Sequence, residues 1–542
     1  AAKSCNHLLS SATNYIVHNL ADQLTGLILY VASTLKPAQG VSSTLSINTN
    51  EKKHKEIHNI NSLTSQNASV VLKSLCFSLS CNLLSGIQHG RYEQPVTVIQ
   101  ACAENLLKAY TIYYDRQQKL PPFEEKELLA GLLSLQASLS FVAINVPQLQ
   151  HLHEYANTLL SQIVTPAGSQ LIGMSGNLAA YSLPDIIDCF DRLTVIIQNI
   201  GKNPPKATVK DDLRAGQSLL SFLRQIWQPM ESLLATAGQT PININLSEAI
   251  CRFIKHAIRN CTLNDQNRAT FQNEFFNKTL AIIDAFFKNG LGRSGAGGSS
   301  SFLYLASIIF TDFGRVNTPQ LNNDMSQLIM SLSTTFSQQF LNPSSFVTCE
   351  DPALIEEYFF MAERIVVHCG GLLVSNRDLL IGMLKLATVQ GGIRCPSKGS
   401  TRAVVSFLHE VLRGSVASEM LSVCGQDIVS AIIAVSLNPS REGGGSPNPT
   451  LTNHKRSVSS LLHTVYSSNP RAMSRMVENA LGGVLLNQRE RFVSRDGIRI
   501  EEWIREEQEV SMAFHSVFGR AGIGLRDVER AVLQYWENVG RA

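Results

Sequence analysis

The sequence predicts an all-α protein that folds as an α-solenoid, with HEAT-type antiparallel helix pairs forming a curved superhelix. Apolar residues recur with helical periodicity almost throughout the 542 residues, and the alternating β-branched runs that indicate strands are nearly absent. The expected helices are mostly joined by short turns, and each pair spans about 40–47 residues, the period of HEAT-type units. One pair cannot bury its own apolar face, so neighbouring pairs must stack. The alternative, a globular helical bundle, would need longer crossovers and fewer short turns.

Composition limits the classes of partner. The chain carries 46 basic and 43 acidic residues, a net charge of +3, which argues against a bulk binder of nucleic acid and leaves only local electrostatic functions. No apolar run reaches the roughly 18 residues that a membrane span needs, so neither nucleic acid nor a membrane is an expected partner. The 11 cysteines show no pairing rhythm and are interpreted as small core residues in a reducing compartment.

Changes in composition divide the chain into helical and non-helical segments. Because Ala1 is not Met and lies within an expected helix, we expect the chain to be a fragment of a longer protein. A small-residue loop is expected at Pro166–Asn177 within the repeats. The expected segments are HEAT helices at 1–36, a disordered polar insertion at 37–67, HEAT repeats at 68–289, a Gly/Ser loop at 290–300, HEAT repeats at 301–438, a flexible loop at 439–452, a HEAT repeat at 453–487, and a charged C-terminal helical cap at 488–542.

The helix expected at 245–262 has two unlike faces. Arg252, Lys255 and Arg259 follow an i, i+3, i+7 spacing that places three cations on one side. Asn245 and Glu248 resemble a capping box that would start this helix. The other side is expected to be a buried stripe of Ile250, Ile254, Ala257, Ile258 and Cys261.

The sequence contains no catalytic signature in its required context. The glycine-rich stretch 292–298 lacks the Gly-Lys-[Ser/Thr] ending of a phosphate loop and follows a helix instead of a strand. His151 and His153 are two residues apart on a helix and do not face each other. We therefore expect no enzyme activity, no cofactor and no metal.

Four stretches together resemble the importin-β superfamily of nuclear transport receptors, in its transportin-SR/importin-13 branch. Their order and spacing agree with that branch, and the resemblance covers most of the chain after about Glu124. The stretches are IIDCFDRLTVIIQNI at 186–200, FLRQIWQPMESL at 222–233, SFLYLASIIFTDFG at 301–314, and PRAMSRMVENALGGVL at 470–485.

The resemblance implies a receptor that binds protein cargo on the concave surface of the solenoid and releases it on RanGTP binding. The stretch 222–233, with Trp227 and Pro229, resembles a helix that carries a Trp and a Pro in transportin-SR. In transportin-SR the next helix is rich in arginine and binds the arginine-serine domains of splicing factors through their phosphoserines. Arg252, Lys255 and Arg259 fall at matching positions, so they are the expected cargo-binding residues, whereas a further family arginine is Ala249 here. Arg364, Arg402 and Arg413 on later helices are not assigned to the site.

The resemblance also implies further partners and a location. Ran GTPase would bind mainly through a missing N-terminal half, and nucleoporins would bind during shuttling between cytoplasm and nucleus. Cargo would be proteins with arginine-serine or phosphorylated segments. An exportin or bidirectional karyopherin is an open alternative, and a HEAT-repeat scaffold or adaptor unrelated to Ran is an alternative of another class.

Overall fold

The structure is a computed structural model. It describes the ranges 93–115, 122–200, 212–237, 243–291, 298–340, 349–437, 455–468 and 472–480, apart from positions 264, 317, 396 and 415. It also describes positions 345 and 482, and isolated positions between 70 and 80 and between 512 and 530. The helices predicted at 1–36, the insertion at 37–67, the loop at 439–452 and most of the cap at 488–542 lie outside these residues.

The described residues fold into helices without strands and divide into two compact units, so the predicted all-α solenoid class is confirmed. The first unit comprises Ala1–Thr240 and Glu248–Phe276, and the second comprises Pro241–Ser247 and Asn277–Ala542. In both units, consecutive helices pack on their neighbours as stacked antiparallel pairs do.

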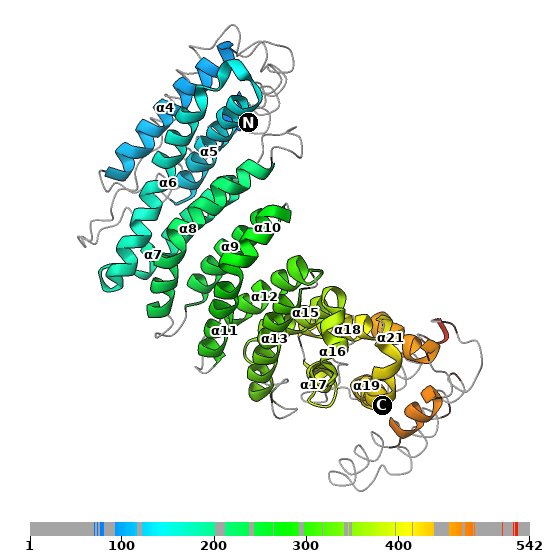
Figure 1. Cartoon of the computed structure of the whole chain (residues 1–542). Helices are drawn as coiled ribbons and strands as arrows, with labels where there is room; N and C mark the ends of the chain where they lie inside the picture. The colour runs from blue at the N-terminus through cyan, green and yellow to red at the C-terminus, as the bar shows by residue number, and fades with distance from the viewer. Residues whose placement is uncertain are drawn as a thin grey trace, which may run out of the picture. The chain divides into compact units, whose positions relative to one another are not determined.

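The first unit has two rows of helices (Figure 1). Helices α5, α7 and α9 follow one another in one row, and α4, α6, α8 and α10 in the other. Apolar side chains such as Leu133, Phe190 and Trp227 are buried in this unit. Burying each contributes about 1.5–3 kcal/mol. The elements are α4 Glu93–Asp115, α5 Pro122–Asn145, a 3-10 turn Pro147–Leu149, α6 Leu152–Gly176, a 3-10 turn Leu178–Ala180, α7 Leu183–Ile200, α8 Asp212–Ala237, α9 Ile244–Cys261, α10 Asp265–Phe271 and a π-helical turn Gln272–Phe276.

The second unit repeats this arrangement. Helices α12, α15, α18 and α21 pack in one row, and α11, α13, α17 and α19 in the other. The stacked rings of Phe336 and Tyr358, with centroids 3.8 Å apart, join α13 to α15. The elements are α11 Asn277–Leu291, α12 Ser299–Phe313, α13 Pro319–Gln339, α15 Pro352–His368, α16 Gly370–Ser375, α17 Arg377–Ala387, a 3-10 turn Gly392–Arg394, α18 Lys398–Arg413, α19 Ala417–Leu437 and α21 Lys455–Ser468.

The loop expected at Pro166–Asn177 is wrong, because α6 continues to Gly176 with Pro166 inside it. Val164, Ala167 and Leu171 are buried on one face across the proline. Proline in a helix interior removes a backbone hydrogen bond and costs about 3 kcal/mol or more. The packing of this face, on α5 and α8 among others, offsets that cost.

Two helices correct the expectation that no apolar run is long enough to cross a membrane. Phe123–Asn145 and Ala417–Ala434 both reach the necessary length and apolar content, and in their most apolar 18-residue windows 61% and 50% of the residues are buried inside the protein. The first is nearly all of α5, which packs on α4, α6 and α7. A helix with neighbours on several sides is apolar around most of its circumference, which explains its composition.

Glu357 on α15 is an acid in an unfavourable environment. It is half-buried, and burial followed by repulsion from Glu356 raises its pKa from 4.5 to about 7. The folded state therefore holds this proton more tightly than the unfolded state, and stability falls as the pH rises from about 4.5 to 7. After allowance for solvent screening of a partly exposed group, the loss amounts to about 1 kcal/mol.

We expect Glu357→Gln to stabilise α15 at pH 8 by about 1 kcal/mol and to lose most of this gain at pH 5, where a protonated Glu resembles Gln. Hydrogen exchange of α15 peptides at the two pH values measures the difference. Glu363→Gln, which removes the same charge from the same helix, is the control. An equal gain at both pH values would contradict the assignment.

Candidate functional site

Helix α9 buries the face that its periodicity predicts. Ile250, Ile254, Ala257, Ile258 and Cys261 all have no exposed surface. The ring of Phe253 meets that of Phe190 on α7 edge to face, with centroids 5.9 Å apart. The helix spans Ile244–Cys261, one residue before the predicted bounds at each end.

The predicted capping box does not start α9. The helix already begins at Ile244, and the backbone N–H of Asn245 donates to the side-chain Oδ1 of Asn243 at 2.9 Å. An Asn before the first helical residue satisfies one of the four N–H groups that a helix start leaves open. Asn243 therefore takes the role that the sequence analysis gave to Asn245.

The three predicted cations lie on the opposite face of α9. Arg252 and Arg259 are exposed, and Lys255 is half-buried. Burial, and then the charges of Arg259 and Arg252, lower the pKa of Lys255. The smaller, electrostatic part of this shift comes from like charges close together, and a bound anion would relieve that repulsion.

Arg252 has an acidic partner that sequence reasoning missed. Its Nη1 donates to Oδ1 of Asp191 on α7 at 2.7 Å, and Lys126 of α5 donates to Oδ2 of the same carboxylate at 2.6 Å. One negative charge thus serves two cations and leaves an excess of one positive charge. Asp191 is 61 residues from Arg252 in sequence, and the helical pattern of α9 contains no signal of it.

Arg259 differs from Arg252 in its contacts. Its side chain makes no ion pair or hydrogen bond to the residues that the structure describes. The two side chains that tie this end of α9 to α7 are His256, hydrogen-bonded to Gln198 at 2.7 Å, and Asn260, which donates to the Ile197 carbonyl at 2.7 Å. The guanidinium of Arg259 is therefore available on a helix that is held in place by other residues.

Ala249, at the position where the transportin-SR resemblance implies a further arginine, is buried, with 1% of its surface exposed. A guanidinium at this position would be enclosed in the protein interior and would need a buried acidic partner. The cationic surface of α9 consequently starts at Arg252, and Ala249 is not part of it.

A second charged cluster lies beside Asp191 on α5 and α7. Arg192 donates from Nε to Oε1 of Glu125 at 2.5 Å and from Nη2 to Oε2 at 2.9 Å, and its Nη1 reaches Gln170. The side chains of Arg192 and Glu125 are only 7% and 13% exposed, so this is a bidentate pair in a largely dry environment.

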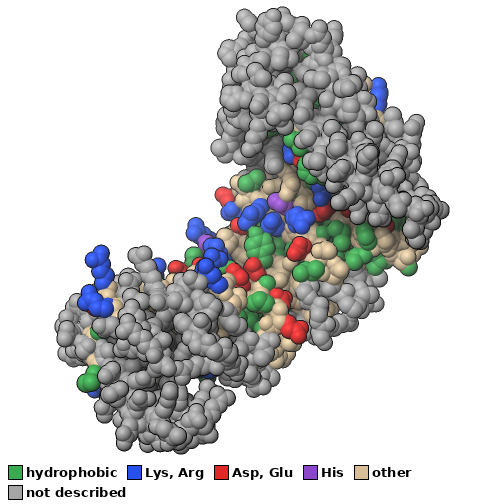
Figure 2. Space-filling model, turned by 180° about the vertical axis from the view of Figure 1, so that it is seen from behind, with side chains coloured by type: hydrophobic (Ala, Val, Ile, Leu, Met, Phe, Trp, Pro, Cys, Tyr) green, Lys and Arg blue, Asp and Glu red, His purple; other side chains and the backbone are tan. Residues whose placement is uncertain are grey.

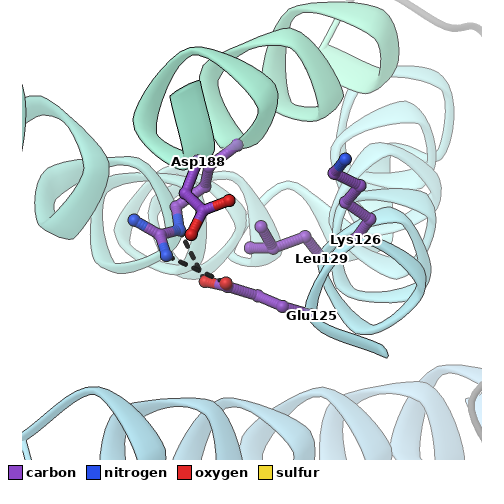
Figure 3. A pocket seen from close by; sticks show the side chains of 5 residues that line it. Glu125, Lys126, Leu129 and Asp188 are labelled. Carbon is purple, nitrogen blue, oxygen red and sulfur yellow. Dashed lines mark hydrogen bonds and ion pairs between the residues drawn. The ribbon is translucent and has the colours of Figure 1, made fainter. Parts of the chain in front are cut away.

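The ion pair occupies a small cleft lined by Glu125, Lys126, Leu129, Asp188 and Arg192 (Figure 3). Figure 3 shows the Glu125 carboxylate pointing toward the guanidinium, whereas Lys126 extends away from it. Arg192 is paired with Glu125, and Lys126 with Asp191, so these ion pairs join α5 to α7 and stiffen the contact between them. Within the described part of the chain, His, Cys, Asp and Glu form no group of three that could hold a metal.

Basic side chains are grouped on the molecular surface. Figure 2 shows one face on which Lys and Arg gather in patches, some with a His, separated by acidic and apolar side chains. Arg224 and Arg268, which flank α9 in sequence, are held in ion pairs to Glu274 and Asp265. Not every basic residue near α9 is therefore available to a partner.

Comparison with known proteins supports the fold. No known protein family and no curated protein matches the sequence. Among solved structures, importin-13 in its cytosolic state is similar at 12% identity with a TM-score of 0.54, and the likeness covers 99% of this chain and 57% of that one. A circular tandem repeat protein with a novel repeat topology gives 10% identity, coverage of 96% and 99%, and a TM-score of 0.22, which is too weak to indicate a shared fold.

The chain thus has the fold of a karyopherin-like HEAT solenoid and spans little more than half the length of the importin-13 structure. At 12% identity the likeness establishes the fold alone. The functional residues must be argued from their own geometry.

Proposed function

We propose that this chain is part of a nuclear transport receptor of the transportin-SR kind, and that α9 binds protein cargo containing arginine-serine-rich or phosphorylated segments. The observation that carries the proposal is the row of Arg252, Lys255 and Arg259 on one face of α9, with both arginines exposed; burial first, and then the charges of Arg259 and Arg252, lower the pKa of Lys255. An anionic ligand is the partner that this row favours electrostatically.

Phosphoserines in an arginine-serine segment match the spacing of the row. On a helix with a rise of about 1.5 Å per residue, the three cations are about 4.5 and 6 Å apart along the axis. Every second side chain of an extended peptide lies on the same side, at intervals of about 6.6 Å. Arg259 offers a bidentate fork to one phosphate, and Lys255 offers a point charge to the next.

Asp191 gives Arg252 a different role from Arg259. The Asp191 carboxylate holds the Arg252 guanidinium at 2.7 Å, so a phosphate must share it with this carboxylate or displace the ion pair. The Arg252 side chain is 42% exposed, but the Asp191 side chain is only 14% exposed, so this is not a fully solvated ion pair. A phosphate at Arg252 would share the guanidinium with Asp191, whose other oxygen is bound by Lys126, so we expect Arg252 to contribute less to cargo binding than Arg259.

The wider role follows the importin type. Cargo would bind the concave side of the solenoid and leave when RanGTP binds, and nucleoporins would bind during shuttling between cytoplasm and nucleus. Ran would bind mainly through a part of the receptor beyond this chain. No reaction is catalysed in this proposal, which agrees with the fold likeness to a transport receptor.

We expect Arg252→Gln with Arg259→Gln to weaken binding of a phosphorylated arginine-serine repeat peptide at least tenfold. Charge-assisted hydrogen bonds contribute about 1.5–3 kcal/mol each, and 1.4 kcal/mol is a factor of ten. Calorimetry at two salt concentrations measures the affinity and its electrostatic share. Gln is preferred to Glu at 252 because a Glu there would face the Asp191 carboxylate.

Arg224→Gln with Arg377→Gln is the matched control, since both arginines are exposed and held in ion pairs on other helices. Unchanged peptide affinity in the α9 variant, with its helical melting curve intact, would reduce the row to a solvated helix face. On the full-length receptor, cargo retained in the presence of RanGTP would contradict import and favour export. Binding insensitive to Ran would favour a scaffold.

A further inference from the structure

Helix α18 in the second unit carries a second basic stripe. Lys398, Arg402 and Arg413 are exposed and His409 is half-buried. Their spacings of 4, 7 and 4 residues place all four within about 60° on a helix. The one acidic residue in α18, Glu410, is off this stripe by the same helical geometry.

The stripe is only weakly neutralised. Arg402 reaches a carboxylate oxygen of Glu356 on α15 at 3.8 Å, at the outer limit of an ion pair, and its guanidinium lies 5.7 Å from the centroid of the Phe360 ring. Lys398 and Arg413 make no ion pair to any described residue. Of the three cations, only Arg402 has a carboxylate of the described chain within ion-pair range, and that one lies at the limit.

The adjacent helices α15 and α12 extend the basic surface at one end. The hydroxyl of Ser400, near the start of α18, donates to the Pro352 carbonyl at the start of α15, so these two helices run in the same direction. The ends of α12 and α15 also meet, since the Cys369 thiol contacts the Phe310 carbonyl at 3.7 Å. The C-terminal ends of all three helices consequently lie on one side of the row.

Each of these ends carries an exposed arginine. Arg315 follows α12, Arg364 lies in the last turn but one of α15, and Arg413 ends α18. Arg315 and Arg364 form no ion pair with the described residues. Burial is the main cause that lowers the pKa of His368, and the charges of Arg315 and Arg364 lower it further. Burial first, and then the charge of Arg413, lower the pKa of His409, while the charge of Glu410 opposes the shift.

Helix stability does not explain the whole stripe. A cation in the last turn of a helix is favoured by the helix dipole, which accounts for Arg413. Lys398 is the first residue of α18, where a positive charge is unfavourable by about 0.3–1 kcal/mol. The helix dipole therefore accounts for Arg413 at the C-terminal end of α18 but not for Lys398 at its N-terminal end, and binding of a partner gives Lys398 a role.

We propose that the exposed face of α18, extended by Arg315 and Arg364, binds an acidic, extended segment of a protein partner, and that this site is separate from the α9 row. Lys398 and Arg402 are about 6 Å apart along the axis, which matches carboxylates on every second residue of an extended peptide, and Arg413 lies about 16 Å further along the same face. The complete stripe, about 22 Å long, accommodates roughly seven such residues.

A peptide fits this surface better than a nucleic acid. Glu356 on the adjacent helix lies 3.8 Å from Arg402 and would repel a continuous phosphate backbone, and the chain has a net charge of only +3. A peptide can place a neutral or basic residue opposite this glutamate. The Phe360 ring beside Arg402 also offers an apolar contact to one peptide side chain.

The test uses a fluorescein-labelled peptide of six Glu-Ser repeats and measures anisotropy at two salt concentrations. We expect Lys398→Gln with Arg402→Gln and Arg413→Gln to weaken its binding at least tenfold. The matched control removes three exposed cations elsewhere in the same unit, Arg377→Gln with Lys385→Gln and Arg394→Gln, and should change the affinity less than twofold.

Two further probes do not depend on the folding of any variant. A Gln-Ser peptide that binds as well as the Glu-Ser peptide would overturn the proposal, because charge would not be its basis. A single-stranded oligothymidine of equal charge that binds more tightly would assign the surface to nucleic acid instead. The two sites are independent if the three α18 substitutions weaken Glu-Ser binding by the same factor with and without Arg252→Gln and Arg259→Gln, and a smaller factor in the combined variant would overturn their separation.

Discussion

Arg192→Ala is expected to destabilise the contact between α5 and α7 by about 3–5 kcal/mol, because it leaves Glu125 charged and largely buried without its partner. The pair has two hydrogen bonds, at 2.5 and 2.9 Å, and side chains 7% and 13% exposed. Solenoid stability is approximately a sum over repeats and their interfaces, so the loss should be local. Hydrogen exchange of peptides from α5 and α7 measures it directly.

Two further variants test whether the loss in Arg192→Ala comes from leaving a charge buried without its partner. Arg224→Ala breaks a bidentate pair with Glu274 whose side chains are 52% and 36% exposed, and it should cost less than about 1 kcal/mol. Arg192→Met with Glu125→Leu removes both charges and should recover most of the loss, since apolar replacement of a buried pair is often neutral. If Arg192→Ala costs no more than Arg224→Ala, the cluster is more hydrated than its geometry indicates.

Trp227→Ala is expected to cost about 3–5 kcal/mol and to open the contact between α8 and α10. Trp227 is 1% exposed, and its ring lies 6.4 Å from that of Phe271 and 4.8 Å from that of Phe275, measured between centroids. Removing the indole leaves a cavity lined by two rings that lose a partner. Hydrogen exchange should quicken in α8, α10 and the π-helical turn that contains Phe275.

The control for this prediction is Trp227→Phe, which retains an aromatic ring at the centre of the cluster and should cost only part of that energy. It loses the hydrogen bond from the indole Nε1 to Glu231 at 3.2 Å, so a small effect is still expected. Protection of α4, two helices distant from α8 in the same row, should be unchanged by either substitution. Uniform loss of protection across the first unit would mean that the repeats unfold together.

Much of the local structure could be predicted from the sequence because helical periodicity is a local property. The five apolar residues predicted for the inner face of α9 are all buried, and the helix bounds differ by one residue at each end. The loop predicted at Pro166 was wrong, because the helix-breaking tendency of this proline is offset by packing along α6. The start of α9 was also misplaced, because two asparagines compete for the cap and Asn243 takes it.

The sequence by itself determined the all-α solenoid class and the face of α9 on which Arg252, Lys255 and Arg259 lie. Only the tertiary structure decided what those cations do at rest: Arg252 shares the Asp191 carboxylate with Lys126, whereas the side chain of Arg259 has no partner in the described chain. The physical reason is distance along the chain. Helix faces are set by neighbours three and four residues away, whereas Asp191 is brought to Arg252 across 61 residues by the stacking of helices.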